Sequence, residues 1–166
     1  MIHVLIVDDD KNLLRVLTNE LSDGGFDAIG TENGMKALDL LEKNDYDVLL
    51  LDLNLPGLGG MDLLKKIKTL AIPVEVIILT GHATVSTAVE AMKLGAYDYL
   101  TKPFQVEELK AVIEKAYEKK ELLQENLHLK TQIKRQSKDQ RIVTKNPIFL
   151  GILEQVKKSL APIFLF

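Results

Sequence analysis

One stretch of the sequence decides the fold: Val48-Leu49-Leu50-Leu51-Asp52-Leu53-Asn54-Leu55-Pro56-Gly57. Four apolar residues run directly into a carboxylate, and a Pro-Gly pair gives a turn signal shortly afterwards. An apolar run of this length, closed by a turn, predicts a strand buried on both faces within a parallel sheet. Asp52 then stands at the strand's carboxyl end, the edge where open α/β sheets bind ligands. Taken alone, Asp52 could equally cap a turn, as Asp often does.

Further apolar segments predict four more strands, at residues 2–7, 26–30, 74–79 and 96–101. Amphipathic helical patterns separate these strands, and a longer helical pattern begins near Phe104. Five strands alternating with five helices predict an α/β fold. The expected architecture is a doubly wound, flavodoxin-like five-stranded parallel sheet, with the last helix extended into a linker.

Polar residues follow four of the predicted strands. The carboxyl ends of parallel strands share one edge of a sheet, so such residues meet in space. The residues concerned are Asp8, Asp9, Asp52, Thr80 and Lys102. Clustered aspartates repel one another unless a cation lies between them, and Mg²⁺ prefers carboxylate oxygens. A solvated acidic turn at residues 8–10 is the alternative.

Lys102 and Thr80 are the candidate partners of a phosphoryl group at this edge. Lys102 precedes a proline, which biases its backbone towards extended conformations and so fixes its direction. A lysine aimed at acids forms salt bridges or steadies phosphoryl oxygens. The Thr80 hydroxyl could donate to a phosphate oxygen or simply end its strand.

Composition excludes several other classes of function. The chain has 166 residues, 46% of them hydrophobic and 27% charged, which suits one ordinary domain with a short appendage. A net charge of -3 predicts no general attraction to nucleic acid or anionic membranes. The absence of cysteine excludes disulfides and thiolate chemistry and fits a cytoplasmic location. No apolar run is long enough to span a membrane.

Four motifs together resemble the receiver domain of bacterial two-component response regulators. They are Ile6-Val7-Asp8-Asp9-Asp10, Leu50-Leu51-Asp52-Leu53-Asn54-Leu55-Pro56-Gly57, Leu79-Thr80-Gly81-His82-Ala83 and Tyr99-Leu100-Thr101-Lys102-Pro103-Phe104. They occur in the family's order and spacing, and the resemblance covers residues 1–120.

The resemblance implies a role for each site residue. Asp52 would accept a phosphoryl group from a sensor histidine kinase. Mg²⁺ would be bound by Asp9, by Asp52 and by the main-chain carbonyl of Asn54, with Asp8 acting through a water. Lys102 and the metal would offset charge on the transferring oxygens.

The same resemblance implies a switch. Thr80 and Tyr99 match the pair that moves on phosphorylation and reshapes the face formed by the fourth helix, fifth strand and fifth helix. Without the resemblance, Tyr99 would be interpreted as an aromatic at the edge of the core. Asn54 and His82 match positions that tune loss of the phosphate, although a lone loop histidine such as His82 is otherwise simply exposed.

Residues 121–140 are expected to form a helical dimerisation linker. Leu122, Asn126, Leu129 and Ile133 recur at coiled-coil spacing, and a polar residue at a core position, here Asn126, tends to fix register. An ordinary solvated helix end is the alternative, because barely two heptads show the pattern.

Residues 141–166 resemble the opening of the AAA+ ATPase domain of NtrC-type activators of sigma-54 RNA polymerase. The sequence contains no phosphate-binding loop with Lys-Ser or Lys-Thr, so it lacks the means for ATP hydrolysis of that kind. We expect a chain truncated before that loop, whose full-length form binds ATP, DNA and sigma-54 RNA polymerase.

Three functions follow from these observations. The first is a phosphorylation-controlled, non-enzymatic signalling module that forms a homodimer through the linker helix and the switch face. The second is a stand-alone phosphohydrolase with Asp52 as turnover nucleophile, which steady hydrolysis of a phosphate ester would reveal. The third is a purely structural dimer with a vestigial acidic pocket, which would not respond to magnesium.

Overall fold

A computed structural model of the protein describes residues 1–81 and 84–139. One compact unit comprises Met1–Glu125 and contains all five strands. Strands and helices alternate along this part of the chain. They are β1 (His3–Val7), α1 (Lys11–Asp23), β2 (Asp27–Thr31), α2 (Gly34–Lys43), β3 (Val48–Leu51), α3 (Gly60–Thr69), β4 (Glu75–Thr80), α4 (Val85–Lys93), β5 (Asp98–Thr101) and α5 (Val106–Asp139).

The strands form one parallel sheet in the order β2-β1-β3-β4-β5. The chain adds strands to one side of β1 and then to the other, which defines a doubly wound sheet with a reversal of strand order beside β1. The predicted fold class is therefore confirmed. The predicted strand bounds differ from the observed ones by one or two residues; β5, for example, begins at Asp98.

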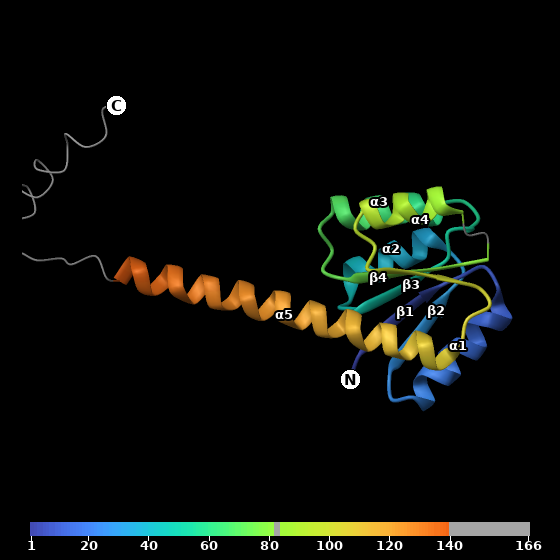
Figure 1. Ribbon diagram of the computed structural model, residues 1–166, viewed down its shortest axis with the longest axis horizontal. Helices are drawn as coiled ribbons and strands as arrows, with labels where there is room; N and C mark the ends of the chain where they lie inside the picture. Colours follow the sequence, from blue (N-terminus) through green and yellow to red (C-terminus); the bar gives the residue numbers. More distant parts are fainter. Residues whose placement is uncertain (82–83, 140–166) are drawn as a thin grey trace, which may run out of the picture. The chain divides into compact units, whose positions relative to one another are not determined.

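Helices cover both faces of the sheet (Figure 1). On one face, α1 and α5 pack through Leu17, Leu21, Leu109 and Ile113. On the other, α2, α3 and α4 pack through a second group of side chains, which includes Ala37, Leu41, Leu63, Ile67 and Ala91. β3, predicted to be buried on both faces, has every residue fully buried from Val48 to Leu51.

Three helices begin at a residue whose side chain accepts hydrogen bonds from free backbone N–H groups. Asp10 accepts hydrogen bonds from the N–H groups of Asn12 and Leu13 at the start of α1. Asn33 caps α2 in the same way, as predicted, and Thr84 caps α4. The caps at Asp10 and Asn33 fix the chain path after β1 and β2, and the loop after β1 carries the acidic run of residues 8–10.

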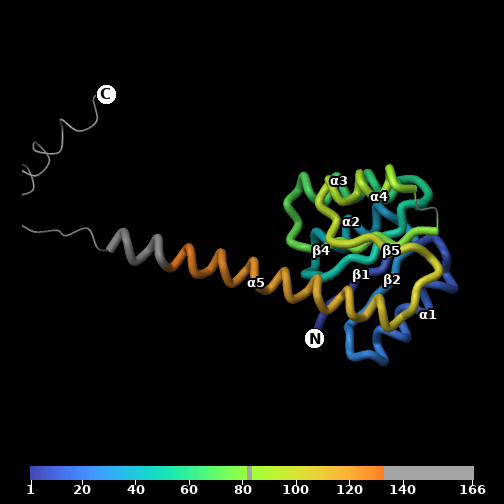
Figure 2. Tube along the Cα trace, viewed as in Figure 1, coloured from blue at the N-terminus to red at the C-terminus, as the bar shows by residue number. Residues whose placement is uncertain are grey.

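The tube in Figure 2 shows α5 running on as a single helix beyond the segment that covers the sheet. Two lysines hold the part of α5 that covers the sheet. Their partners lie near the amino ends of β3 and β4, at the edge of the sheet opposite the acidic residues. Lys119 Nζ lies 3.0 Å from Glu75 Oε2, and Lys120 Nζ donates to Tyr46 O at 2.9 Å and to Asp47 Oδ1 at 2.8 Å. In the described residues, no helix is long and apolar enough to cross a membrane.

Residues 141–166, expected to begin an ATPase domain, lie outside the described residues. The same holds for His82 and for the side chain of Ile133. The helical character expected for the linker is observed as far as Asp139. The proposed boundaries at residues 120 and 140 remain predictions.

Candidate functional site

The site lies where β1 and β3 end side by side. The β1–β3 ladder pairs Val7 with Leu51, and Asp52 N donates to Val7 O at 2.9 Å, one residue beyond the strands. Asp8 and Asp52 are thereby placed next to each other at the carboxyl edge. Their side chains are almost fully buried, with exposed fractions of 1% and 6%.

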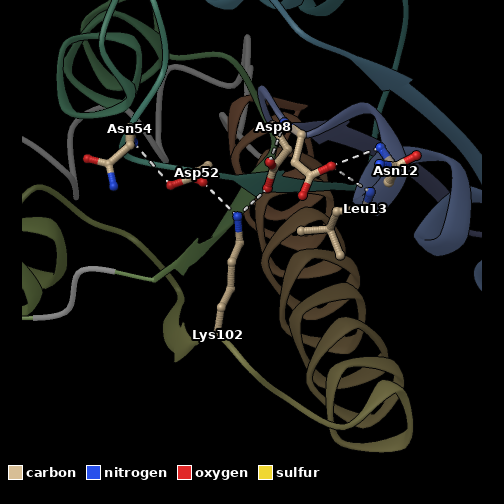
Figure 3. Close-up of polar contacts among 7 residues, drawn as sticks. Asp8, Asn12, Leu13, Asp52, Asn54 and Lys102 are labelled. Carbon is tan, nitrogen blue, oxygen red and sulfur yellow. Dashed lines mark hydrogen bonds and ion pairs between the residues drawn. The ribbon is translucent and has the colours of Figure 1, made fainter.

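Lys102 reaches this pair from β5. Its backbone N–H donates to Thr80 O at 2.9 Å, which fixes the start of its side chain beside β4. The peptide bond between Lys102 and Pro103 is cis. Figure 3 shows Nζ lying between the two aspartates, 2.5 Å from Asp8 Oδ2 and 2.6 Å from Asp52 Oδ2.

Backbone groups engage the other carboxylate oxygens. Asn54 N donates to Asp52 Oδ1 at 3.0 Å, and Asp10 N donates to Asp8 Oδ1 at 3.0 Å. Both aspartates are therefore held by one ammonium group and one N–H each. Such charge-assisted hydrogen bonds offset much of the cost of burying two carboxylates.

Electrostatics favour a charged lysine at this position. Burial by itself lowers the pKa of Lys102, but hydrogen bonds to Asp52 and Asp8, together with their charges, outweigh it and leave the pKa raised. Burial raises the pKa of Asp8, and the hydrogen bond from Lys102 offsets only part of this. The charged states of Asp8 and Lys102 are therefore linked.

The acidic residues fit a hard divalent cation. Asp8, Asp9 and Asp52 each offer a carboxylate oxygen, and these atoms lie within 4.8 Å of one another. Asp9 is exposed whereas the other two are buried, so the group opens to solvent on one side. Oxygen ligands of this kind, with room for waters, suit Mg²⁺. The expected role of the Asn54 carbonyl stays a prediction.

Asp10 takes no part in this group. Although it continues the acidic run of residues 8–10, its side chain accepts from the backbone at the start of α1. The expected switch residues lie on the neighbouring strands. Thr80 is buried at the end of β4, with 1% of its surface exposed, and Tyr99 is half-buried in β5, paired in register with Ile78.

Sequence reasoning missed Gly60, which closes the loop after Asp52. A Cβ at this position would overlap the carbonyl oxygen of Asp52 and lie 2.6 Å from the Cα of Leu53. The first turn of α3 therefore packs directly against the backbone that carries the central aspartate. Among ten glycines, no local signal distinguishes this one; the contact arises only in the fold.

Comparison with known proteins agrees with this geometry. The model of the family described as response regulator receiver domain matches residues 4–114. The regulatory protein AtoC of Escherichia coli K12 is 33% identical over 155 residues, which are 93% of this chain and 34% of AtoC. The transcriptional regulator NtrC of the same strain is 42% identical over 113 residues, 68% of this chain and 24% of NtrC.

A solved structure shows the same fold. The solution structure of the beryllofluoride-activated NtrC4 receiver domain dimer superposes with a TM-score of 0.69 at 33% identity, covering 72% of this chain and 99% of that one. The family match and the aspartate–lysine cluster at the carboxyl edge together support a module for phosphorylation-driven signalling. The chain belongs to the response regulator receiver domain family, and its relatives include NtrC-type activators. The matched residues span about a third of the length of AtoC and about a quarter of the length of NtrC.

Proposed function

We propose that this chain is the receiver and linker of an NtrC-type activator, and that it accepts a phosphoryl group on Asp52 from a sensor histidine kinase. The observation that carries the proposal is the position of Asp52. Its carboxylate stands at the carboxyl edge of the sheet, with a lysine on one oxygen and two further aspartates beside it.

The reaction assigns a role to each group. An Asp52 oxygen attacks the phosphorus of a phosphohistidine, the new O–P bond replaces the P–N bond, and the imidazole leaves with the electron pair and takes up a proton. Lys102 offsets negative charge on the phosphoryl oxygens, which is the main form of catalysis open to a protein in phosphoryl transfer. Mg²⁺ held by Asp9, Asp52 and the Asn54 carbonyl, with Asp8 acting through water, would supply further positive charge.

The register of the sheet supports the proposed switch. Side chains alternate along a strand, so Ile78 and Thr80 share a face of β4, and Tyr99 lies on that same face of β5 opposite Ile78. On phosphorylation, the Thr80 hydroxyl turns towards the phosphate and the Tyr99 ring follows it inward. Such a change is a shift between two pre-existing conformations.

We extend the proposal to a homodimer formed through the linker helix and the switch face. In α5, Leu122, Leu123, Leu127 and Leu129 are each at least half exposed, with fractions from 50% to 66%. Association of two such helices along the proposed seam would remove the apolar surface of Leu122 and Leu129 from water. Asn126, proposed as a core residue of the seam, is exposed as well.

The longer protein would bind ATP, DNA and sigma-54 RNA polymerase, because the relatives that this chain matches in part are NtrC-type regulators. Phosphorylation of Asp52 would act on these activities through the dimer. Whether it forms or loosens the active dimer is decided by the following experiment.

The experiment is sedimentation velocity on this chain and on Asp52→Ala, with Mg²⁺ and with or without beryllofluoride, a mimic of the aspartyl phosphate. We expect a change in association state or shape in the native chain alone. Bound beryllofluoride without such a change would refute the coupling to the linker. No binding at all would refute the assignment of Asp52.

A further inference from the structure

The hydroxyl group of Tyr99 contacts the first turn of α4. Its oxygen lies 3.3 Å from Thr87 Oγ1, and both side chains are half-buried. The ring also packs against the core beneath α2, α3 and α4. The tyrosine expected to move in the switch is thus bonded to the helix that borders the switch face.

Thr87 belongs to the capping box of α4, so its hydroxyl has partners on α4 as well as on Tyr99. Thr87 Oγ1 donates to Thr84 O at 2.9 Å and accepts from Thr84 N at 3.2 Å. The same oxygen lies 3.0 Å from Thr84 Oγ1, and either hydroxyl could be the donor in that contact and in the contact with Tyr99. The Tyr99–Thr87 bond therefore joins the ring to the group of hydroxyls that caps α4.

We propose that Thr87 is a positioning residue that holds the Tyr99 ring in its present position and thereby opposes the active conformation. The inference rests on the proposed function, in which the ring turns inward on phosphorylation. In this proposal the Tyr99–Thr87 bond belongs to the present ring position, and inward rotation would break it. The hydroxyl of Thr87 then contributes to the equilibrium between the two conformations without touching the phosphate.

Four variants separate this role from simple capping of the helix. Thr87→Val removes the hydroxyl at nearly constant shape, and Thr87→Ser retains it. Thr84→Val is the control for capping, because it removes the side chain that accepts from Thr87 N and contacts Thr87 Oγ1 at 3.0 Å, but it removes neither hydroxyl of the Tyr99–Thr87 pair. Tyr99→Phe removes the same bond from the other side.

The first readout is the affinity for beryllofluoride in Mg²⁺, measured by NMR titration. A net hydrogen bond of ordinary strength corresponds to roughly a two- to tenfold effect, so Thr87→Val should lower the apparent Kd by that factor. Thr87→Ser and Thr84→Val should stay near the native value. In the Tyr99→Phe background, Thr87→Val should have no further effect. An unchanged or raised Kd in Thr87→Val, or equal effects in both backgrounds, would overturn the proposal.

The second readout is the fluorine resonance of Tyr99 in protein labelled with 3-fluorotyrosine, assigned among four tyrosines by Tyr99→Phe. Thr87→Val should shift this resonance in the ligand-free chain, whereas Thr84→Val should not. The ligand-free spectra test the role of Thr87 independently of the assignment of Asp52. If the native chain binds no beryllofluoride, the assignment of Asp52 fails, and the ligand-free spectra still decide whether Thr87 holds the ring.

Discussion

Lys102 Nζ lies 2.6 Å from Asp52 Oδ2, and the same nitrogen lies 2.5 Å from Asp8 Oδ2. One cation therefore joins two buried carboxylates that come from different strands. This bridge brings together the ends of β1 and β3 and the residue that follows β5, and it leaves the three side chains with a net negative charge. The site is stable enough to form, yet it retains an excess of negative charge that a divalent cation can offset.

Replacing the shared lysine should destabilise the fold. In Mg²⁺-free buffer, Lys102→Met leaves two buried carboxylates without their cation, and we expect a loss of about 2 kcal/mol in the free energy of unfolding. The value is below that of a fully buried pair because 21% of the Lys102 side chain is exposed. Urea denaturation measures it, with the exposed Lys43→Met as control.

A double variant tests whether Asp52 causes that loss. Asp52→Asn removes one of the two charges, so Lys102→Met should cost clearly less in this background than in the native chain. The loss should also shrink as the pH is lowered, because protonated carboxyls need no cation and burial already raises the pKa of Asp8. Additive effects of the two substitutions at neutral pH would show that no such coupling exists.

Gly60→Ala should disturb the backbone of the central aspartate. The added methyl group would overlap the Asp52 carbonyl, so α3 must shift, at a cost of about 3 kcal/mol. The adjacent Gly59→Ala is the matched control, since a Cβ at Gly59 meets nothing within 4 Å and φ there is -61°. Thermal unfolding of the two variants compares them directly. Equal stabilities would mean that α3 does not constrain this loop.

Magnesium should stabilise the native chain through the acidic cluster. A ligand that binds only the folded state at ten times its Kd adds about 1.4 kcal/mol to the free energy of unfolding. Asp9→Asn replaces one charged carboxylate with a neutral amide and should reduce this gain, whereas Asp39→Asn, which alters an exposed ion pair with Lys43, should retain it. Urea titrations with and without Mg²⁺ give both values. An equal gain in the two variants would place the metal elsewhere.

Lys120→Met should loosen α5 from the sheet. This side chain is only 12% exposed, and it donates both to Asp47 and to the Tyr46 carbonyl. Loss of two such hydrogen bonds should cost about 2 kcal/mol. Lys43→Met serves as control, since its exposed pair with Asp39 contributes little. Hydrogen exchange across residues 109–120 should speed up only in Lys120→Met; equal protection in both variants would contradict this role.

The sheet and its acidic edge could be predicted because their signals are local. Each strand is a short apolar run followed by a polar residue, and parallel pairing then brings Asp8, Asp52 and Lys102 together without further information. The starts of α2 at Asn33 and of α4 at Thr84 could also be predicted, because both residue types are common helix caps. Asp10 was harder, because an acidic run gives no sign of which member turns away to cap a helix.

Contacts between distant segments could not be predicted. Lys120 and Asp47 are 73 residues apart, and nothing in their neighbourhoods marks one lysine among 21 basic residues as their link. The same holds for Gly60 against Asp52 and for Thr87 against Tyr99. In each case the contact arises because whole helices and strands pack together, and a single sequence does not show how they pack.

Phosphorylation of the native chain by a small phosphodonor tests the central claim most directly. The chain and Asp52→Asn are incubated with acetyl phosphate and Mg²⁺, and the product is examined by intact mass and by peptide mapping after borohydride reduction of the acyl phosphate. We predict one phosphoryl group per native chain, located on Asp52, and none on the variant. Equal modification of both chains, or a phosphoryl group on another residue, would contradict the account.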